Sequence, residues 1–116
     1  MALTHAALRQ FTGTDKWYRH PLVRWMLYTE GVRYVAEEGG AYWLIDKVAT
    51  LQLAPKIKTE RFQQWKFVRE GNAGTLTCDD GNDNVVHKER IHLTDFPLDE
   101  ITFWVENNVI CLPSER

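Results

Sequence analysis

The sequence predicts an α+β fold, in which an antiparallel sheet of about five to seven strands packs against one main helix, with a short helix near the N-terminus. Two patterns carry this prediction. Apolar residues recur at spacings of three and four over residues 41–53, as they do on one face of a helix. Residues 62–113 instead form short β-rich runs separated by turn residues, with no repeated strand–helix–strand unit.

The first forty residues are expected to hold a short helix and then a β-hairpin. In "THAALRQFTG", Thr4 is placed to cap the helix and Gly13 follows its end. After the segment "WYRHP", the β-rich runs 22–28 and 32–36 flank the sequence "TEG". Two such runs around a short polar turn are typical of paired strands.

The main helix is predicted over residues 41–53, before Pro55. The residues expected to pack against the sheet are Ala41, Leu44, Ile45 and Val48. The strands expected after it are 62–70, 75–78, 85–93, 101–105 and 109–113, joined by "GNAG", "DDGNDN", "DFPLDE" and "ENN". Because the last of them, "VICLP", is short and apolar, we expect it to form a sheet edge that a second copy of the chain covers.

Length and composition indicate a single domain over residues 1–116, because 116 residues with 44% apolar content suffice for one core. The net charge of −2 gives no overall electrostatic reason to expect nucleic acid or an anionic membrane as partner.

The chain contains no run of apolar residues long enough to cross a membrane and no signal-peptide pattern, so we expect a cytoplasmic protein. Cys78 and Cys111 are accordingly expected as free thiols rather than a disulfide.

The residue patterns predict no metal site, no cofactor and no catalytic residue. His87 and His92 lie five residues apart on one predicted strand and so on opposite faces. The segment "DDGNDN" lacks glycine at the position that a calcium loop requires, and its composition is typical of a hairpin loop. The one serine, Ser114, lies in no nucleophile motif, and Cys78 is expected to be buried rather than activated by His87.

A first candidate binding surface lies on the outer face of the predicted sheet. If alternate residues of the strands point to the core, Lys88, Arg90 and Trp104 point together to the other face. The same alternation adds Lys66, His92 and Thr102 to this face. Basic groups beside a tryptophan suit single-stranded nucleic acid or an acidic protein, whereas the overall acidity favours a merely solvated face.

A second candidate is the corner "WYRH", with Tyr18, Arg19 and His20 as possible ligand contacts. Extended geometry before a proline projects Trp17 and Arg19 to one side and Tyr18 and His20 to the other. We expect Trp17 to close the core, with Tyr18 or His20 bonded to backbone at the corner. If the corner is a site instead, Asp15 is near enough in sequence to orient the histidine.

Three stretches, "FTGTDKWYRH", "LYTEGVRYVAEEGGAYWLIDKVA" and "DFPLDEITFWVENNVICLPSE", together resemble a family of small bacterial proteins known only as a domain of unknown function. The resemblance extends over nearly the whole chain. The resemblance implies a bacterial protein of a kind that mobile elements can carry, and it transfers no activity, cofactor or catalytic residue.

The leading functional hypothesis is a non-enzymatic binding module that acts on a protein partner and associates with itself. The alternative is a small enzyme or ligand-binding protein with a pocket near Tyr18, Arg19 and His20. A second alternative is a nucleic-acid binder that uses the basic outer face with Lys88, Arg90 and Trp104.

Overall fold

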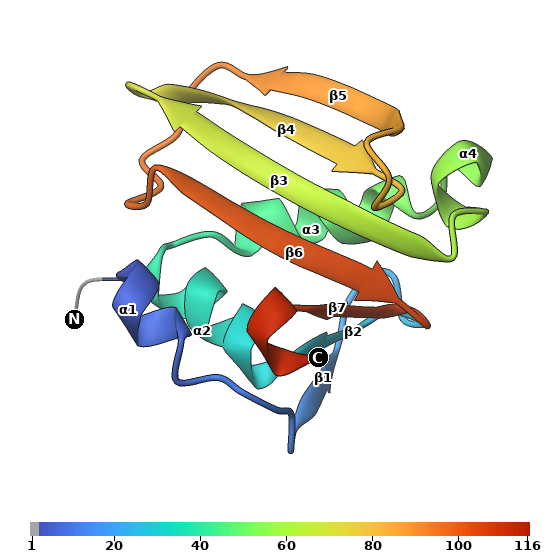
Figure 1. Ribbon diagram of the computed structural model, residues 1–116, viewed down its shortest axis with the longest axis horizontal. Helices are drawn as coiled ribbons and strands as arrows, with labels where there is room; N and C mark the ends of the chain where they lie inside the picture. Colours follow the sequence, from blue (N-terminus) through green and yellow to red (C-terminus); the bar gives the residue numbers. More distant parts are fainter. Residues whose placement is uncertain (1–2) are drawn as a thin grey trace.

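A computed structural model describes residues 3–116, which form four α-helices, one 3-10 turn and a seven-stranded sheet (Figure 1). The helices are α1 (His5–Leu8), α2 (Glu30–Glu38), α3 (Tyr42–Leu51) and α4 (Pro55–Lys58), and the 3-10 turn is η1 (Pro113–Glu115). The strands are β1 (Trp17–Arg19), β2 (Leu27–Thr29), β3 (Phe62–Glu70), β4 (Ala73–Asp79), β5 (Val85–Ile91), β6 (Glu100–Glu106) and β7 (Val109–Cys111). Among these residues no helix is both long and apolar enough to cross a membrane.

The sheet has the strand order β1-β2-β7-β6-β3-β4-β5. Every neighbouring pair is antiparallel except β2 and β7, which run parallel. The prediction of an α+β fold with a mostly antiparallel sheet is therefore confirmed, and the strands expected after the main helix form β3 to β7. However, β7 lies between β2 and β6, so the prediction that "VICLP" forms a sheet edge is wrong. The edges are β1 and β5.

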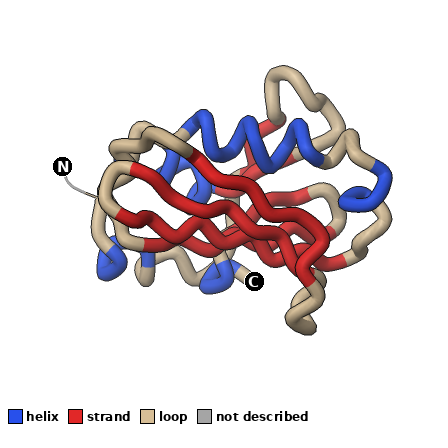
Figure 2. Tube along the Cα trace, turned by 90° about the horizontal axis from the view of Figure 1, so that it is seen from above, coloured by secondary structure: helices blue, strands red, loops and turns tan. Residues whose placement is uncertain are grey.

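One face of the sheet is apolar and buried. Its buried side chains include Trp65, Phe67, Leu76, Cys78, Ile101, Phe103, Val105 and Ile110. Trp43 of α3 contacts Phe67 edge to face, with ring centroids 5.5 Å apart. Figure 2 shows that helical segments lie along one side of the strands. The residues predicted for the buried face of this helix, Ala41, Leu44, Ile45 and Val48, are all buried.

Two helices of similar length contribute to the core, rather than one main helix. The segment predicted as the second strand of a hairpin, residues 32–36, belongs to the nine-residue helix α2. The hydroxyl of Thr29 accepts a hydrogen bond from the N–H of Val32 and so caps this helix. Val32, Val35 and Ala36 then recur at helical spacing and are buried. The hairpin prediction is wrong because "TEG" starts a helix instead of turning a strand.

The first helix is shorter than expected. Thr4 caps it as predicted, since its hydroxyl accepts a hydrogen bond from the N–H of Ala7 at 3.1 Å. The helix nevertheless ends after Leu8, and the chain reaches β1 through an irregular segment. Leu8 packs into the core, which fixes α1 near the start of β6.

The packing of α3 predicts a large loss of stability for Ile45→Ala, because this side chain is almost completely buried. The free energy of unfolding in denaturant should fall by about 2 to 5 kcal/mol. Thr50→Ala, on the exposed side of the same helix, serves as control and should change it by about 0.5 kcal/mol or less. Similar losses for the two variants would contradict the assigned buried face.

Candidate functional site

The corner "WYRH" consists of the edge strand β1 and the turn after it. Tyr18 lies opposite Tyr28 of β2 and stacks on it, with ring centroids 5.7 Å apart. The guanidinium of Arg33 lies over the Tyr18 ring at 4.6 Å. Trp17 lies on the other side of the strand and its side chain is 52% exposed. The prediction that Trp17 closes the core is therefore wrong, because an edge strand leaves this side of β1 without a covering element.

His20 is a structural residue of this corner. Its side chain is only 1% exposed, and its Nδ1 accepts hydrogen bonds from the N–H groups of Leu22 and Val23 at 3.2 and 3.0 Å. The proton must then reside on Nε2, which donates to Oδ1 of Asp46 at 2.7 Å. Both ring nitrogens are thus occupied, which confirms the expected bond to backbone. The orienting carboxylate comes from Asp46 on α3 and not from Asp15.

Arg19 lies at the surface beside this histidine but points away from it. Its guanidinium donates to the carbonyl oxygen of Arg24, within the same turn. Tyr18, Arg19 and His20 are therefore neighbours in sequence, but their side chains do not converge on one point and form no common site. Tyr18 faces α2, Arg19 faces the opposite side of the sheet, and His20 is buried against α3.

These contacts predict that His20→Ala lowers the free energy of unfolding by about 1 to 3 kcal/mol, since two N–H groups lose their acceptor. Denaturant unfolding measures the change. Arg19→Ala is the control at the exposed neighbouring position and should cost about 0.5 kcal/mol or less. If His20→Ala proved as mild as Arg19→Ala, the structural role would be contradicted.

The face of the sheet opposite the core carries the other predicted residues, and we call it the open face. Its members on the four strands β6, β3, β4 and β5 include Gln64, Lys66, Val68, Thr75, Thr77, Lys88, Arg90, Thr102 and Trp104. Thr77 lies opposite both Lys66 and Lys88, and Lys66 lies opposite Thr102, so these four side chains form one row across the sheet.

The open face is less basic than predicted. Arg90 forms an ion pair with Glu70 at 2.9 Å and also donates to the hydroxyl of Thr75. Glu100 and Glu106 lie on the same face through their positions in β6. Within residues 3–116, Lys66 and Lys88 take part in no ion pair. His92 is exposed but follows the end of β5.

A hollow of about 320 Å³ lies on the open face near β1. We call it the tryptophan hollow and define it by Trp17, Phe62, Trp104, Val109 and Cys111. Phe62 and Trp104 meet edge to face with centroids 5.3 Å apart, and the Trp104 indole N–H donates to Gln64. The guanidinium of Arg116 lies 5.3 Å from the Phe62 centroid and 5.5 Å from that of Trp104.

Sequence reasoning placed only Trp104 of this hollow among the candidate residues. A large apolar side chain such as that of Trp17 is expected in the core. The signal against that assignment was already present, since alternation groups Trp17 with the polar Arg19 and not with the buried His20. Phe62 opens a strand whose alternate residues Gln64 and Lys66 are polar, which likewise indicates the outer face.

The two cysteines are free thiols, as expected. Cys78 lies opposite His87 across β4 and β5, but the Nε2 of His87 bonds to Glu89 at 2.9 Å. Burial raises the pKa of the Cys78 thiol to about 12, and burial likewise raises the pKa of Cys111 to about 11. The thiols are therefore protonated near neutral pH and unsuited to nucleophilic catalysis.

This predicts slow alkylation of both thiols by iodoacetamide in the folded protein near neutral pH, with fast labelling after unfolding in guanidinium. Mass spectrometry counts the modified cysteines. Because both pKa values lie above the ordinary value of 9.0, the unfolded chain loses these protons first, and the free energy of unfolding should fall as pH rises above 9.0. Rapid labelling of Cys78 in the folded protein would contradict its burial.

The polar loop "DDGNDN" is a hairpin connection, as predicted. The carboxylate of Asp80 accepts hydrogen bonds from the N–H groups of Asn82 and Asn84 and from the Asn84 amide. These bonds lower the pKa of Asp80, the Asn84 side chain contributing most. Throughout the described part of the chain, no cluster of three or more histidine, cysteine or acidic residues is placed to hold a metal ion.

Fold and site together define a small α+β protein with an apolar hollow on the open side of its sheet. The chain belongs to a family of unknown function: the model described as "Family of unknown function (DUF6876)" matches residues 2–116. This confirms the family resemblance expected from the sequence. Comparison with curated proteins and with solved structures gave no match.

Proposed function

We propose that this protein is a non-enzymatic interaction module that binds a protein partner through the open face of its sheet. The observation that carries the proposal is the tryptophan hollow, in which the half-exposed Trp17 and the rings of Phe62 and Trp104 surround a concave apolar surface. Exposed aromatic groups around a depression are typical of the residues that dominate binding energy at protein interfaces.

The aromatic rings suit an apolar side chain that projects from the partner. Trp17 leaves water when such a side chain enters, and Val109 and Cys111 provide further apolar surface. Trp104 is held by its bond to Gln64 and by the edge-to-face contact with Phe62, so this wall is ordered before binding. A preorganised wall lowers the entropy that association must overcome.

Two lysines elsewhere on the open face favour an acidic partner. The carboxylates that line the hollow are already bonded, Glu106 to Arg116 and Glu115 to Thr29. Lys66 and Lys88 lie on the same face without an ion-pair partner within residues 3–116, whereas Arg90 is already paired with Glu70. Carboxylates on the partner would complement the two lysines and steer the encounter. We therefore infer a protein partner with a projecting apolar side chain and, farther across the open face, acidic residues opposite Lys66 and Lys88.

The alternatives have weaker support. A ligand pocket at Tyr18, Arg19 and His20 requires a histidine with a nitrogen available, and both nitrogens of His20 are bonded. Nucleic-acid binding requires basic groups at several phosphates, and among the described residues of this face only Lys66 and Lys88 are cations without an ion pair. The free thiols Cys78 and Cys111 suit the reducing cytoplasm that the sequence led us to expect.

The test compares the proteins captured from the native host by the wild-type chain and by Trp17→Ala. Since Trp17 is half exposed, we expect its substitution to cost about 1 kcal/mol or less in stability. Capture of a specific partner should nevertheless fall at least tenfold, because the main wall of the hollow is removed. Trp25→Ala is the matched control, as this tryptophan packs under the Lys58 ammonium and does not line the hollow.

A second variant tests the charge argument. Lys88→Glu should weaken capture of the same partner and reduce its dependence on salt, while the free energy of unfolding stays nearly constant. Equal capture by wild type, Trp17→Ala and Lys88→Glu would overturn the proposal. So would a salt-sensitive gel shift with single-stranded DNA, or a partner that proves to be only a second copy of the chain by sedimentation.

A further inference from the structure

The first half of β6 has a neighbouring strand on one side only. β3 pairs with β6 from Glu100 to Glu106. On the other side β7 is short and pairs only with Trp104, Val105 and Glu106. Figure 1 shows the chain leaving the sheet after β7 and forming η1 beside β6. The stretch from Glu100 to Phe103 therefore borders a gap in the interior of the sheet.

The hydrogen-bond alternation shows which backbone groups point into this gap. The N–H of Arg69 donates to the carbonyl of Asp99 at 2.7 Å, which makes these two opposing residues a hydrogen-bonded pair. The backbone N–H and carbonyl groups of alternate β6 residues, including Ile101, therefore bond to β3. The backbone groups of the residues between them face the side on which β7 lies. Thr102 thus directs its N–H and carbonyl into the gap, and Glu100 directs its carbonyl there, since its N–H bonds to the Asp99 side chain.

Proline explains why β7 does not fill the gap. The register of β6 and β7, in which Trp104 lies opposite Cys111, places Pro113 opposite Thr102. Proline has no N–H to donate to the Thr102 carbonyl, so strand pairing cannot continue. Pro113 begins η1 instead. In the described residues, the Thr102 backbone has no hydrogen-bond partner on this side.

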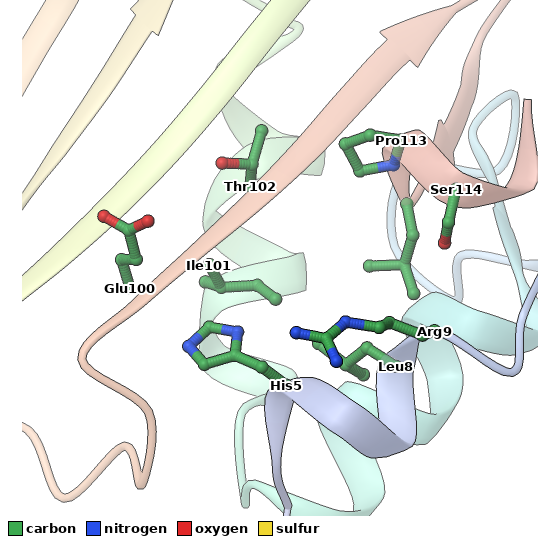
Figure 3. A pocket seen from close by; sticks show the side chains of 9 residues that line it. His5, Leu8, Arg9, Glu100, Ile101, Thr102, Pro113 and Ser114 are labelled. Carbon is green, nitrogen blue, oxygen red and sulfur yellow. The ribbon is translucent and has the colours of Figure 1, made fainter.

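The gap opens into a hollow of about 240 Å³ between α1, β6 and η1 (Figure 3). Its apolar floor consists of Leu8, Ile101 and Leu112, all of which are buried. A surface that combines an unpaired strand edge with an apolar floor is suited to an extended peptide, because the backbone groups bind the main chain and the floor takes a side chain.

A cation lies over the same hollow. Arg9, just after α1, extends its guanidinium between His5 and the apolar floor, and the hydroxyl of Ser114 points from η1 toward α1 (Figure 3). His5 is already paired with Asp99 at 2.8 Å. Within residues 3–116 Arg9 takes part in no ion pair, which leaves it available for a carboxylate.

We propose that this gap binds the C-terminal segment of a partner protein by strand addition, with the terminal carboxylate at Arg9 and Ser114. A chain end fits better than an internal segment, because η1 closes the gap at Pro113 and a strand cannot run on past it. Glu100 at the opposite end repels a carboxylate, so the segment runs parallel to β6 with its terminus toward η1. One residue then donates to the Glu100 carbonyl and accepts from the Thr102 N–H.

This inference goes beyond the proposed function and does not depend on it. The tryptophan hollow and the gap share no lining residue, and η1 separates them. Trp17→Ala should therefore leave peptide binding unchanged, and Arg9→Ala should leave capture through the tryptophan hollow unchanged. Either proposal can fail while the other holds.

The test uses the full chain and a pool of synthetic peptides with randomised C-terminal residues and a free carboxylate. We expect wild-type protein to enrich a subset of these peptides. Amidation of the terminal carboxylate and the variant Arg9→Ala should each weaken binding of the enriched peptides at least tenfold. Lys56→Ala, which removes a cation on α4 away from the gap, is the matched control and should bind as wild type does.

Three results would overturn the inference. The first is the absence of any enriched peptide. The second is enrichment that amidation or Arg9→Ala leaves intact. The third is binding of amidated peptides with internal aspartate or glutamate as tight as that of the enriched peptides, which would identify a side-chain carboxylate as the ligand. Circular dichroism of Arg9→Ala confirms folding, so that lost binding reports on the gap alone.

Discussion

The buried carboxylate of Glu115 fixes the arrangement on which both candidate surfaces depend. It accepts hydrogen bonds from the hydroxyl of Thr29 at 2.6 Å and from the N–H groups of Gly31 and Leu112 at 3.1 and 2.9 Å. Its charge also lies at the start of α2, where the helix dipole favours an anion. A Cβ at Gly31 would lie 2.7 Å from the carboxylate, so glycine permits this close approach.

This contact holds η1 against the start of α2 and therefore off the sheet. Because η1 stays there, Thr102 keeps an unpaired backbone edge on one side of the turn. On the other side, Glu115 and Arg116 border the tryptophan hollow, with Arg116 paired to Glu106 at 2.9 Å. One buried carboxylate thus shapes two neighbouring surfaces of different chemistry, the first suited to main chain and the second to an apolar side chain.

The parts of the fold that sequence predicted correctly have strong local patterns. α3 shows helical spacing between two stops, and β3 to β6 alternate between turns rich in glycine, asparagine and aspartate. The sequence does not predict α2, because "TEG" satisfies a hairpin turn as well as a helix start. The cap by Thr29 is local, but the N–H of Gly31 also donates to Glu115, which is distant in sequence. A pattern of neighbouring residues carries no information on this Gly31–Glu115 contact.

The candidate site was predictable to a similar extent. Alternation placed Lys88, Arg90 and Trp104 on one face, as the strand register has them, but it carried no information on the pairing of Arg90 with Glu70. The sequence also does not predict that His20 bonds to Asp46, since Asp46 lies on another element. The gap beside β6 depends on the strand order and on the register at Pro113, which only the three-dimensional arrangement defines.

Amide hydrogen exchange, followed by NMR residue by residue, tests most directly whether η1 leaves an open edge in the sheet. If the account is right, the N–H of Thr102 exchanges rapidly with solvent, while those of Ile101 and Phe103 on either side are protected by their bonds to β3. If Thr102 is protected as strongly as these two neighbours in the free protein, the edge is already paired, and the account of the gap is wrong.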